Sequence, residues 1–285
     1  MSDTGLWPTG ARTAVSITVD NLGEAAEIEL GLRPVDVPLG GHYSVTTALP
    51  IMLETLASAG LVATFFVEGI NAEIYPEALA TITYAGHEIG CHAWCHEDWS
   101  SLDERAELAN LDRSLAAFRA IGIEPTGFRP PGGLINADTL ELLEVCGLRH
   151  CSPAGSVAGI DRVPVLPFSW PAVDVFHILP AFAALREHLT GDPEPGGADA
   201  VRAALSESID DALVSGRHTT LVLHTWAIEL ELEAVRDVLA RVSEGVASGE
   251  LWAAPCGKVA AWMTANTESF DIPTLLDRTS WMTPS

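Results

Sequence analysis

The chain has 285 residues, 48% hydrophobic and 19% charged, a composition that excludes a disordered or fibrous protein. Its 15 Lys and Arg residues against 39 Asp and Glu residues give a formal net charge of −24. So negative a chain is expected to bind neither nucleic acid nor an anionic membrane surface. No apolar run reaches the length of a membrane span, so we expect no membrane association.

The first half of the chain alternates segments typical of strands and helices. A β-rich run over 14–19 ends at Asp20 and enters a long loop over about 21–45. Capping residues and terminating glycines then delimit helices that follow short apolar strands. The expected segments are a helix over 46–59, a strand over 63–67, a helix over 75–85, a strand over 87–92, a helix introduced by a capping box at 101–104 and ending at 121, a strand over 126–129 and a helix capped by Asn136 that ends before Gly147.

The second half continues the same alternation. The expected segments are strands over 150–152 and 163–168, a helix over 199–215, a strand over 219–224, a helix over 229–248, a strand over 251–254 and a helix through Trp262. This rhythm is typical of parallel strands joined by helical crossovers. No linker divides the chain, so residues 1–285 are predicted to form one α/β domain.

The cysteines and the N-terminus bear on location. Five cysteines are an odd number, and the N-terminus shows no basic segment followed by an apolar one. Both features favour free thiols and a cytoplasmic protein. Cys91 and Cys95 lie beside two histidines and allow a closed structural metal site. Because neighbouring residues on a strand or helix point in different directions, we favour small buried thiols for both.

A histidine pair stands out in the segment GHEIGCHAWCHEDW, residues 86–99. His92 and His96 are four residues apart, and on one face of a helical turn two imidazoles can share a zinc ion or a similar cation. Two unrelated histidines also show this spacing by chance, so it is weak evidence alone. Its position at the end of a predicted strand strengthens it.

Four further ionisable residues fall at or just after predicted strands. Asp20 ends SITVD, Arg129 lies in GFRPPGG, Asp174 follows LPFSWPAV, and His224 ends LVLH. Each alone is compatible with an ordinary loop residue. Active sites of parallel α/β barrels lie at the C-terminal ends of the strands. The convergence of these residues with His92 therefore predicts an enzyme that uses a metal.

In this order, the segments TVDN, ATFFVEG, GHEIGCHAWCHEDW, GFRPPGG, Trp170 to Asp174 and LVLHTW resemble the polysaccharide deacetylase family, also called the NodB homology family or carbohydrate esterase family 4. The resemblance runs from about residue 14 to residue 262. Cytoplasmic allantoinase-like amidases look more similar than secreted chitin or peptidoglycan enzymes. The resemblance implies a distorted (β/α)7 TIM-like barrel and one divalent metal, usually Zn²⁺ but in some members Co²⁺ or Ni²⁺.

The resemblance also implies roles for the strand-end residues. Asp20 corresponds to the catalytic base, and Arg129 to the residue that orients it. His224 corresponds to the catalytic acid, and Asp174 to the residue that orients that histidine.

The metal ligands show one departure from the family pattern. The two histidines of the HxxxH pair correspond to the two metal-binding histidines, but the usual third ligand, an aspartate, is replaced by Asn21. An amide oxygen is a neutral and weaker ligand than a carboxylate. This replacement allows three alternatives. In the first, Asn21 binds the metal weakly. In the second, Asp20 becomes the ligand and leaves the base role to Glu24, Glu27 or another acid, and in the third both the metal and the hydrolysis are lost.

These observations favour a hydrolase of a non-peptide carbon–nitrogen bond in a small molecule, such as an N-acetyl group or a cyclic amide. Trp94, Phe168 and Trp170 are expected to line its pocket. The main alternative is a metal-poor family member that binds a small molecule or has changed chemistry. A barrel with a purely structural role in an oligomer is the third interpretation, and a homo-oligomer is compatible with all three.

Overall fold

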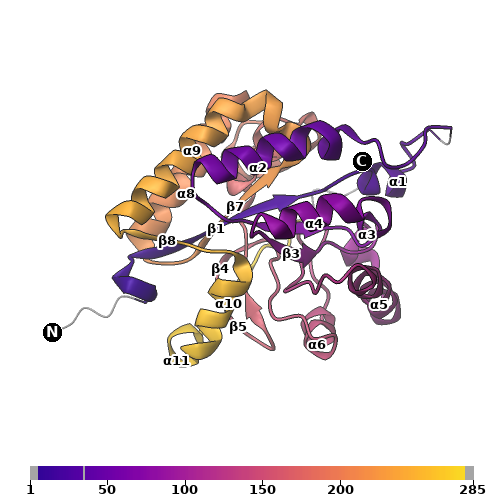
Figure 1. Cartoon of the computed structure of the whole chain (residues 1–285). Coiled ribbons are helices and arrows are strands. Elements are labelled where there is room, and N and C mark those ends of the chain that lie inside the picture. The colour runs from indigo at the N-terminus through magenta and orange to yellow at the C-terminus, as the bar shows by residue number, and fades with distance from the viewer. Residues whose placement is uncertain (1–5, 35, 280–285) are drawn as a thin grey trace.

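A parallel β-sheet forms the centre of the molecule in a computed structural model that describes residues 6–34 and 36–279 (Figure 1). Its strand order is β3-β2-β1-β7, and β8 also pairs with β1. All these pairs are parallel. The strands are β1 (Thr13–Asp20), β2 (Thr64–Val67), β3 (Glu88–Cys91), β7 (Thr219–His224) and β8 (Leu251–Ala253). The five strands lie where the sequence predicts strands, within about two residues.

Single parallel bridges continue the sheet beyond β3. Cys91 pairs with Phe128, Phe128 with Cys151, and Cys151 with Val165, while Val173 pairs with Val222 of β7 from the other side. The strands expected near 126–129 and 150–152 are therefore reduced to bridge contacts. This succession of parallel contacts curves the sheet as in a distorted (β/α) barrel.

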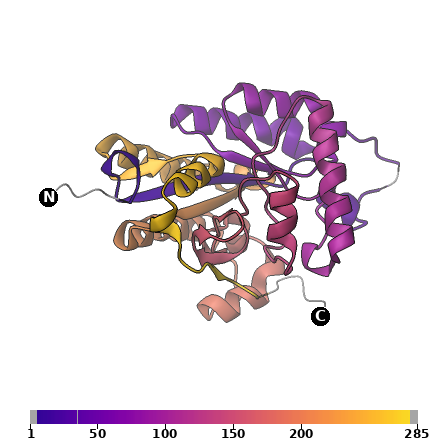
Figure 2. The ribbon, with the colours of Figure 1, turned by 90° about the horizontal axis from the view of Figure 1, so that it is seen from below.

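Helices cover this sheet and alternate with its strands. Figure 1 shows α2, α8 and α9 on one side of β1 and α10 and α11 on the other. Seen from below, α5 and α6 lie side by side at the end away from α10 (Figure 2). The helices are α1 (Ala25–Glu29), α2 (Leu49–Ser58), α3 (Asn71–Ile74), α4 (Pro76–Tyr84), α5 (Glu104–Ala120), α6 (Thr139–Val145), α7 (Ala183–Thr190), α8 (Gly197–Ser215), α9 (Ile228–Ser248), α10 (Cys256–Ala265) and α11 (Thr267–Phe270).

Local chemistry explains several of these boundaries. All eight residues of β1 are buried, as expected for a parallel strand covered on both faces. The side chain of Asp103 accepts a hydrogen bond from the backbone N–H of Ala106 and caps α5. Gly216 and Gly249 adopt left-handed backbone conformations that end α8 and α9.

Other boundaries correct the sequence expectations. The loop expected over 21–45 contains α1, and a π-helical turn (Ser44–Ala48) precedes α2. Asn136 does not cap α6, because its side-chain amide donates to the carbonyls of Trp99 and Leu102 at 2.9 and 3.0 Å. Helix α7 was not expected. The short antiparallel pairs β4 (Gly155–Val157) with β9 (Leu275–Leu276) and β5 (Gly159–Ile160) with β6 (Pro164–Val165) were not expected either, although β6 lies within the strand expected over 163–168.

The cysteines agree with the predicted free thiols. All five are free, and Cys91 and Cys95 are buried. Burial raises the pKa of each of these two thiols to about 12, so both are neutral at physiological pH. Within the described residues, neither thiol belongs to the group of close ligand atoms that includes His92 and His96, which argues against a closed structural site. Among the described helices, none is both long and apolar enough to cross a membrane.

Buried His218 predicts acid sensitivity of the fold. Burial lowers its pKa from 6.5 to about 3, and Nε2 lies 2.9 Å from the Ser16 hydroxyl. Below pH 6.5 the unfolded chain binds a proton at His218, whereas the folded chain does not. The free energy of unfolding is therefore unaffected by His218 above pH 6.5 and decreases as the pH falls below it. From pH 7 to pH 5, His218 is expected to cost about 2 kcal/mol of unfolding free energy.

Urea unfolding of the wild type and of His218→Gln, at both pH values and with a chelator present, measures this contribution. The variant should lose less stability than the wild type on acidification. Equal losses would mean that His218 titrates alike in the folded and unfolded chains.

Candidate active site

The C-terminal ends of the central strands meet at one pocket. Asp20, the last residue of β1, is in register with Phe66 of β2 and with His224 of β7. The pocket has a volume of about 160 Å³ and is lined by Asp20, Asn21, His92, His96, Arg129 and His224, among other residues. The structure thus brings the predicted base, acid and metal-binding histidines into one cavity.

Asp20 is held by a buried arginine. Arg129 Nη1 donates to Asp20 Oδ1 at 2.7 Å and to Thr18 Oγ1 at 2.8 Å. Arg129 Nη2 donates to Ser152 Oγ at 2.8 Å, and the guanidinium carbon lies 4.3 Å from the centre of the Phe66 ring. Asp20 and Arg129 are 7% and 1% exposed, so their charges compensate each other away from water. This arrangement fixes the direction of the Asp20 carboxylate, as predicted for Arg129.

His224 is held by a buried aspartate. Asp174 lies in a 3-10 turn (Asp174–His177), and its Oδ1 is 2.6 Å from His224 Nδ1. Its Oδ2 accepts the backbone N–H of His224 at 2.6 Å. Burial alone lowers the pKa of His224, but the Asp174 carboxylate and this hydrogen bond outweigh burial, so the pKa is raised. The imidazole can therefore carry a proton near neutral pH.

A third acid, not expected from the sequence, lies behind this pair. Glu231 of α9 is buried, and its backbone leaves the helical conformation (φ −138°). Burial, together with the neighbouring Asp174 charge, raises the pKa of Glu231 to about 10. A neutral Glu231 adds no second negative charge beside Asp174.

His92 and His96 meet, but on a loop and not on the helical turn that their spacing suggests. Both follow β3, and Ala93 and His96 have positive φ angles of 61° and 70°. Their ring centres are 5.0 Å apart. His92 Nδ1 donates to the Arg129 carbonyl at 2.8 Å, which leaves the lone pair on Nε2. Burial lowers the pKa of each imidazole to about 3, so both are neutral, the form that binds metals.

Sequence reasoning also missed Glu68, which lies beside the histidine pair. Within the described residues, its carboxylate and the rings of His92 and His96 offer ligand atoms within 4.8 Å of one another, and Asp20 is outside this set. Burial, together with the Asp20 charge, raises the pKa of Glu68 to about 8. The sequence carried a signal, because Glu68 follows a buried strand directly, as Asp20 and His224 end theirs.

Comparisons with known proteins place these residues in a family. Residues 36–151 match the sequence model described as Polysaccharide deacetylase. The structure superposes with a TM-score of 0.80 and 25% identity on a putative polysaccharide deacetylase from Mycobacterium smegmatis, over 96% of both chains. Residues 36–151 therefore match a polysaccharide deacetylase domain, and the whole chain shares its fold. The predicted family resemblance and distorted (β/α)7 barrel are thereby confirmed.

Other matches to the deacetylase domain are more distant or shorter. An allantoinase (Puue) superposes with a TM-score of 0.71 and 18% identity over 91% of this chain and 92% of its own, which shows a shared fold. Chitin deacetylase 1 of Saccharomyces cerevisiae is 40% identical over 86 residues, which are 30% of this chain and 29% of that protein. Peptidoglycan deacetylase-like protein FGM2 of Gibberella zeae is 34% identical over 113 residues, 39% and 33% of the two chains. The matched region therefore spans about a third of these curated relatives.

Asn21 lies at the pocket in an unusual backbone conformation. Its φ is 57°, and within residues 6–34 and 36–279 its buried Oδ1 has no hydrogen-bond partner. The two acids considered as replacement bases lie elsewhere and do not line the pocket. Glu24 accepts hydrogen bonds from Tyr75 Oη and the Gly40 N–H, and Glu27 contacts His42. The geometry therefore favours Asp20 as the base.

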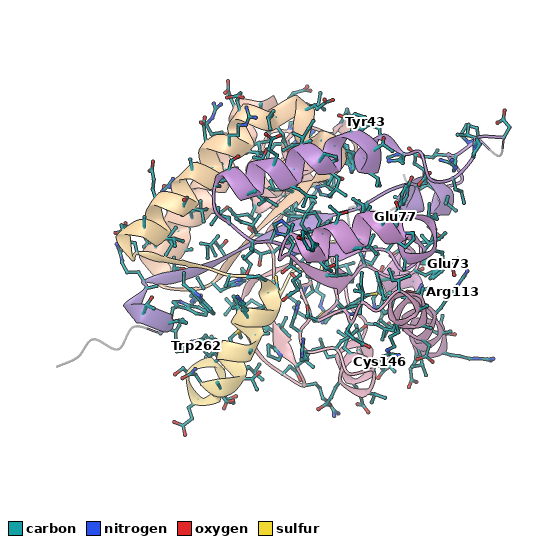
Figure 3. All side chains as sticks on the ribbon, viewed as in Figure 1. Tyr43, Glu73, Glu77, Arg113, Cys146 and Trp262 are labelled. Atoms are coloured by element: carbon teal, nitrogen blue, oxygen red, sulfur yellow. The ribbon has the colours of Figure 1, made fainter. Side chains whose placement is uncertain are left out.

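The pocket wall of the deacetylase domain is mainly apolar and aromatic. Phe168 and Trp170 line it, as predicted, and so do Phe182 and Trp226. Trp94, predicted as a third aromatic of this wall, instead packs with Ala25 and Cys95 outside the pocket. The guanidinium of Arg113, which extends from α5 (Figure 3), lies 3.6 Å from the centre of the Trp94 ring. The loop turn at residue 93 directs Trp94 away from the pocket.

Proposed function

We propose that the chain is a metal-dependent hydrolase of a non-peptide amide bond. The observation that carries this proposal is that Asp20 and His224 line the same pocket as His92 and His96. Asp20 and His224 are each fixed by a buried partner, Arg129 and Asp174 respectively. Two imidazoles and an oxygen ligand suit a divalent first-row cation, Zn²⁺ first and Co²⁺ or Ni²⁺ as alternatives. The orphaned buried oxygens of Asn21 and Glu68 fit such an ion, because each lacks a partner in the protein.

The side chains divide the hydrolysis between them. When bound, the metal polarises the amide carbonyl and lowers the pKa of a water molecule. Asp20, oriented by Arg129, accepts the proton of the attacking water. His224, protonated on Nε2 and held through Nδ1 by Asp174, donates a proton to the leaving nitrogen. The aromatic wall excludes bulk water from the reacting groups.

The pocket supports a compact substrate with an apolar part next to the amide. Leu30, Leu179, Phe182 and Trp226 surround the catalytic groups, and a chain of net charge −24 repels anionic polymers. The names of the curated relatives support a second candidate, the N-acetyl groups of chitin or peptidoglycan. Parallel assays of acetate or amine release from N-acetylglucosamine oligomers, small N-acyl amines and cyclic amides separate the candidates. Turnover of oligomers alone would reject the small-molecule assignment.

The alternative function is that of a metal-free binding protein. It is suggested by Asn21, which replaces the usual aspartate ligand with a neutral amide. The fold is shared, at a TM-score of 0.51 and 14% identity, with BA3943 of Bacillus anthracis, which is described as a pseudoenzyme. Metal content separates the two functions. Protein purified without added metal should contain nearly one equivalent of Zn²⁺, Co²⁺ or Ni²⁺, and His92→Ala should lose it, because His92 offers a buried neutral ligand. Wild-type protein that stays metal-free after soaking in Zn²⁺ would instead favour the binding protein.

A further inference from the structure

Glu68 is fixed beside the two histidines by the backbone. It follows the last residue of β2, and the His92 N–H donates to the Val67 carbonyl at 2.9 Å. The next residue continues this pairing, since the Gly69 N–H donates to the Ala93 carbonyl at 2.8 Å. The Glu68 side chain is fully buried. Its position is therefore set by the same pairing that positions the histidine loop.

The two oxygens of the Glu68 carboxylate have different surroundings. Oε2 accepts hydrogen bonds from the Leu22 N–H at 3.3 Å and from Asn71 Nδ2 at 2.9 Å. Oε1 is buried and has no hydrogen-bond partner among the residues that the structure describes. An unpartnered buried carboxyl oxygen is costly, and a cation bound between it and the two histidines would remove this cost. The carboxylate is anchored on one side and free on the other, as a single-oxygen metal ligand requires.

The alternatives for a third ligand are weaker. Asp20 Oδ1 is bound to Arg129, and Asp20 lies outside the set of close ligand atoms. Asn21 offers only a neutral amide oxygen. Two histidines and one glutamate form a known type of catalytic zinc site. With Glu68 in the set, the site has one carboxylate despite Asn21, and Asp20 stays available as the base.

We propose that Glu68 is the third protein ligand of the metal in this chain and takes the place of the aspartate that Asn21 replaces. This inference rests on the proposed function, since it assumes a cation at His92 and His96. The carboxylate that binds the metal is then Glu68, directly after β2, and the carboxylate that acts as the base is Asp20, at the end of β1.

Binding of Co²⁺ to the metal-free protein, followed by visible absorption and calorimetry, tests the assignment without any assay of activity. Glu68→Gln should weaken binding by at least about 100-fold, beyond the 10–100-fold typical of residues that only support a ligand. Asn21→Ala should change the affinity by less than about 10-fold. The double variant Asn21→Asp with Glu68→Gln should recover binding, because it returns a carboxylate to the family position.

Three outcomes distinguish the inference from the proposed function. Glu68→Gln that binds like the wild type, while His92→Ala does not bind, would overturn only the assignment of Glu68. A large loss in Asn21→Ala would make Asn21 the ligand instead. A wild type that binds no Co²⁺ would overturn both the assignment and the metal-dependent function. Recovery in the double variant also shows that loss in Glu68→Gln is not a folding defect.

Discussion

His224→Ala is expected to lower kcat by about 100- to 10,000-fold while metal binding is retained. In the proposed mechanism the variant removes the group that protonates the leaving nitrogen, and the pKa of His224, which Asp174 raises against the effect of burial, suits this role. Steady-state kinetics on the best substrate found in the amide assays, together with metal analysis, measures both quantities. His188→Ala is a matched control, because His188 is exposed on α7.

Measuring kcat and metal content separately tests the role of His224. Loss of activity with a full metal complement supports a catalytic acid, whereas loss of the metal as well would make His224 part of the metal site. Activity equal to that of the His188→Ala control would contradict the proposed mechanism.

Arg129→Met is expected to destabilise the fold by about 3–5 kcal/mol, because it leaves the Asp20 carboxylate buried without its partner. Total stabilities of domains are about 5–15 kcal/mol, so the loss should be visible in chemical unfolding. The double variant with Asp20→Asn should lose less than the sum of the single variants, because both charges are then absent.

A surface pair provides the control for this experiment. Arg162 Nη2 lies 2.8 Å from Glu141 Oε2, and both side chains are more than half exposed. Arg162→Met should cost no more than about 1 kcal/mol. If Arg129→Met costs as little as the control, the interpretation of Arg129 as a desolvated clamp is wrong.

Much of the framework was predictable because its signals are local. β1 and β7 are segments of strand-forming residues that end in an ionisable residue, and the left-handed glycines Gly216 and Gly249 end α8 and α9 as expected. The same logic correctly grouped Asp20, Arg129 and His224 at one edge of the sheet. Strand-end position is thus a good predictor of the site, since parallel strands bring their C-terminal ends together.

The remaining features depend on long-range contacts or backbone conformation. Residue spacing does not reveal that Ala93 and His96 adopt positive φ, so the histidine pair was assigned to a helix. That loop also removes Trp94 from the predicted wall. The role of Asn136 depends on carbonyls about 35 residues away in the chain. The single-domain organisation, the cytoplasmic location and a homo-oligomer stay predictions.

Three non-glycine residues with left-handed backbones lie in the strand-end loops at the pocket: Asn21, Ala93 and His96. Such a conformation costs roughly 1 kcal/mol or more for a residue with a side chain, and it persists only where the surrounding structure enforces it. The loops are therefore ordered when the chain folds, and not by the binding of a ligand. Capture of a cation then requires little additional loss of conformational entropy, which favours tight binding over rapid exchange.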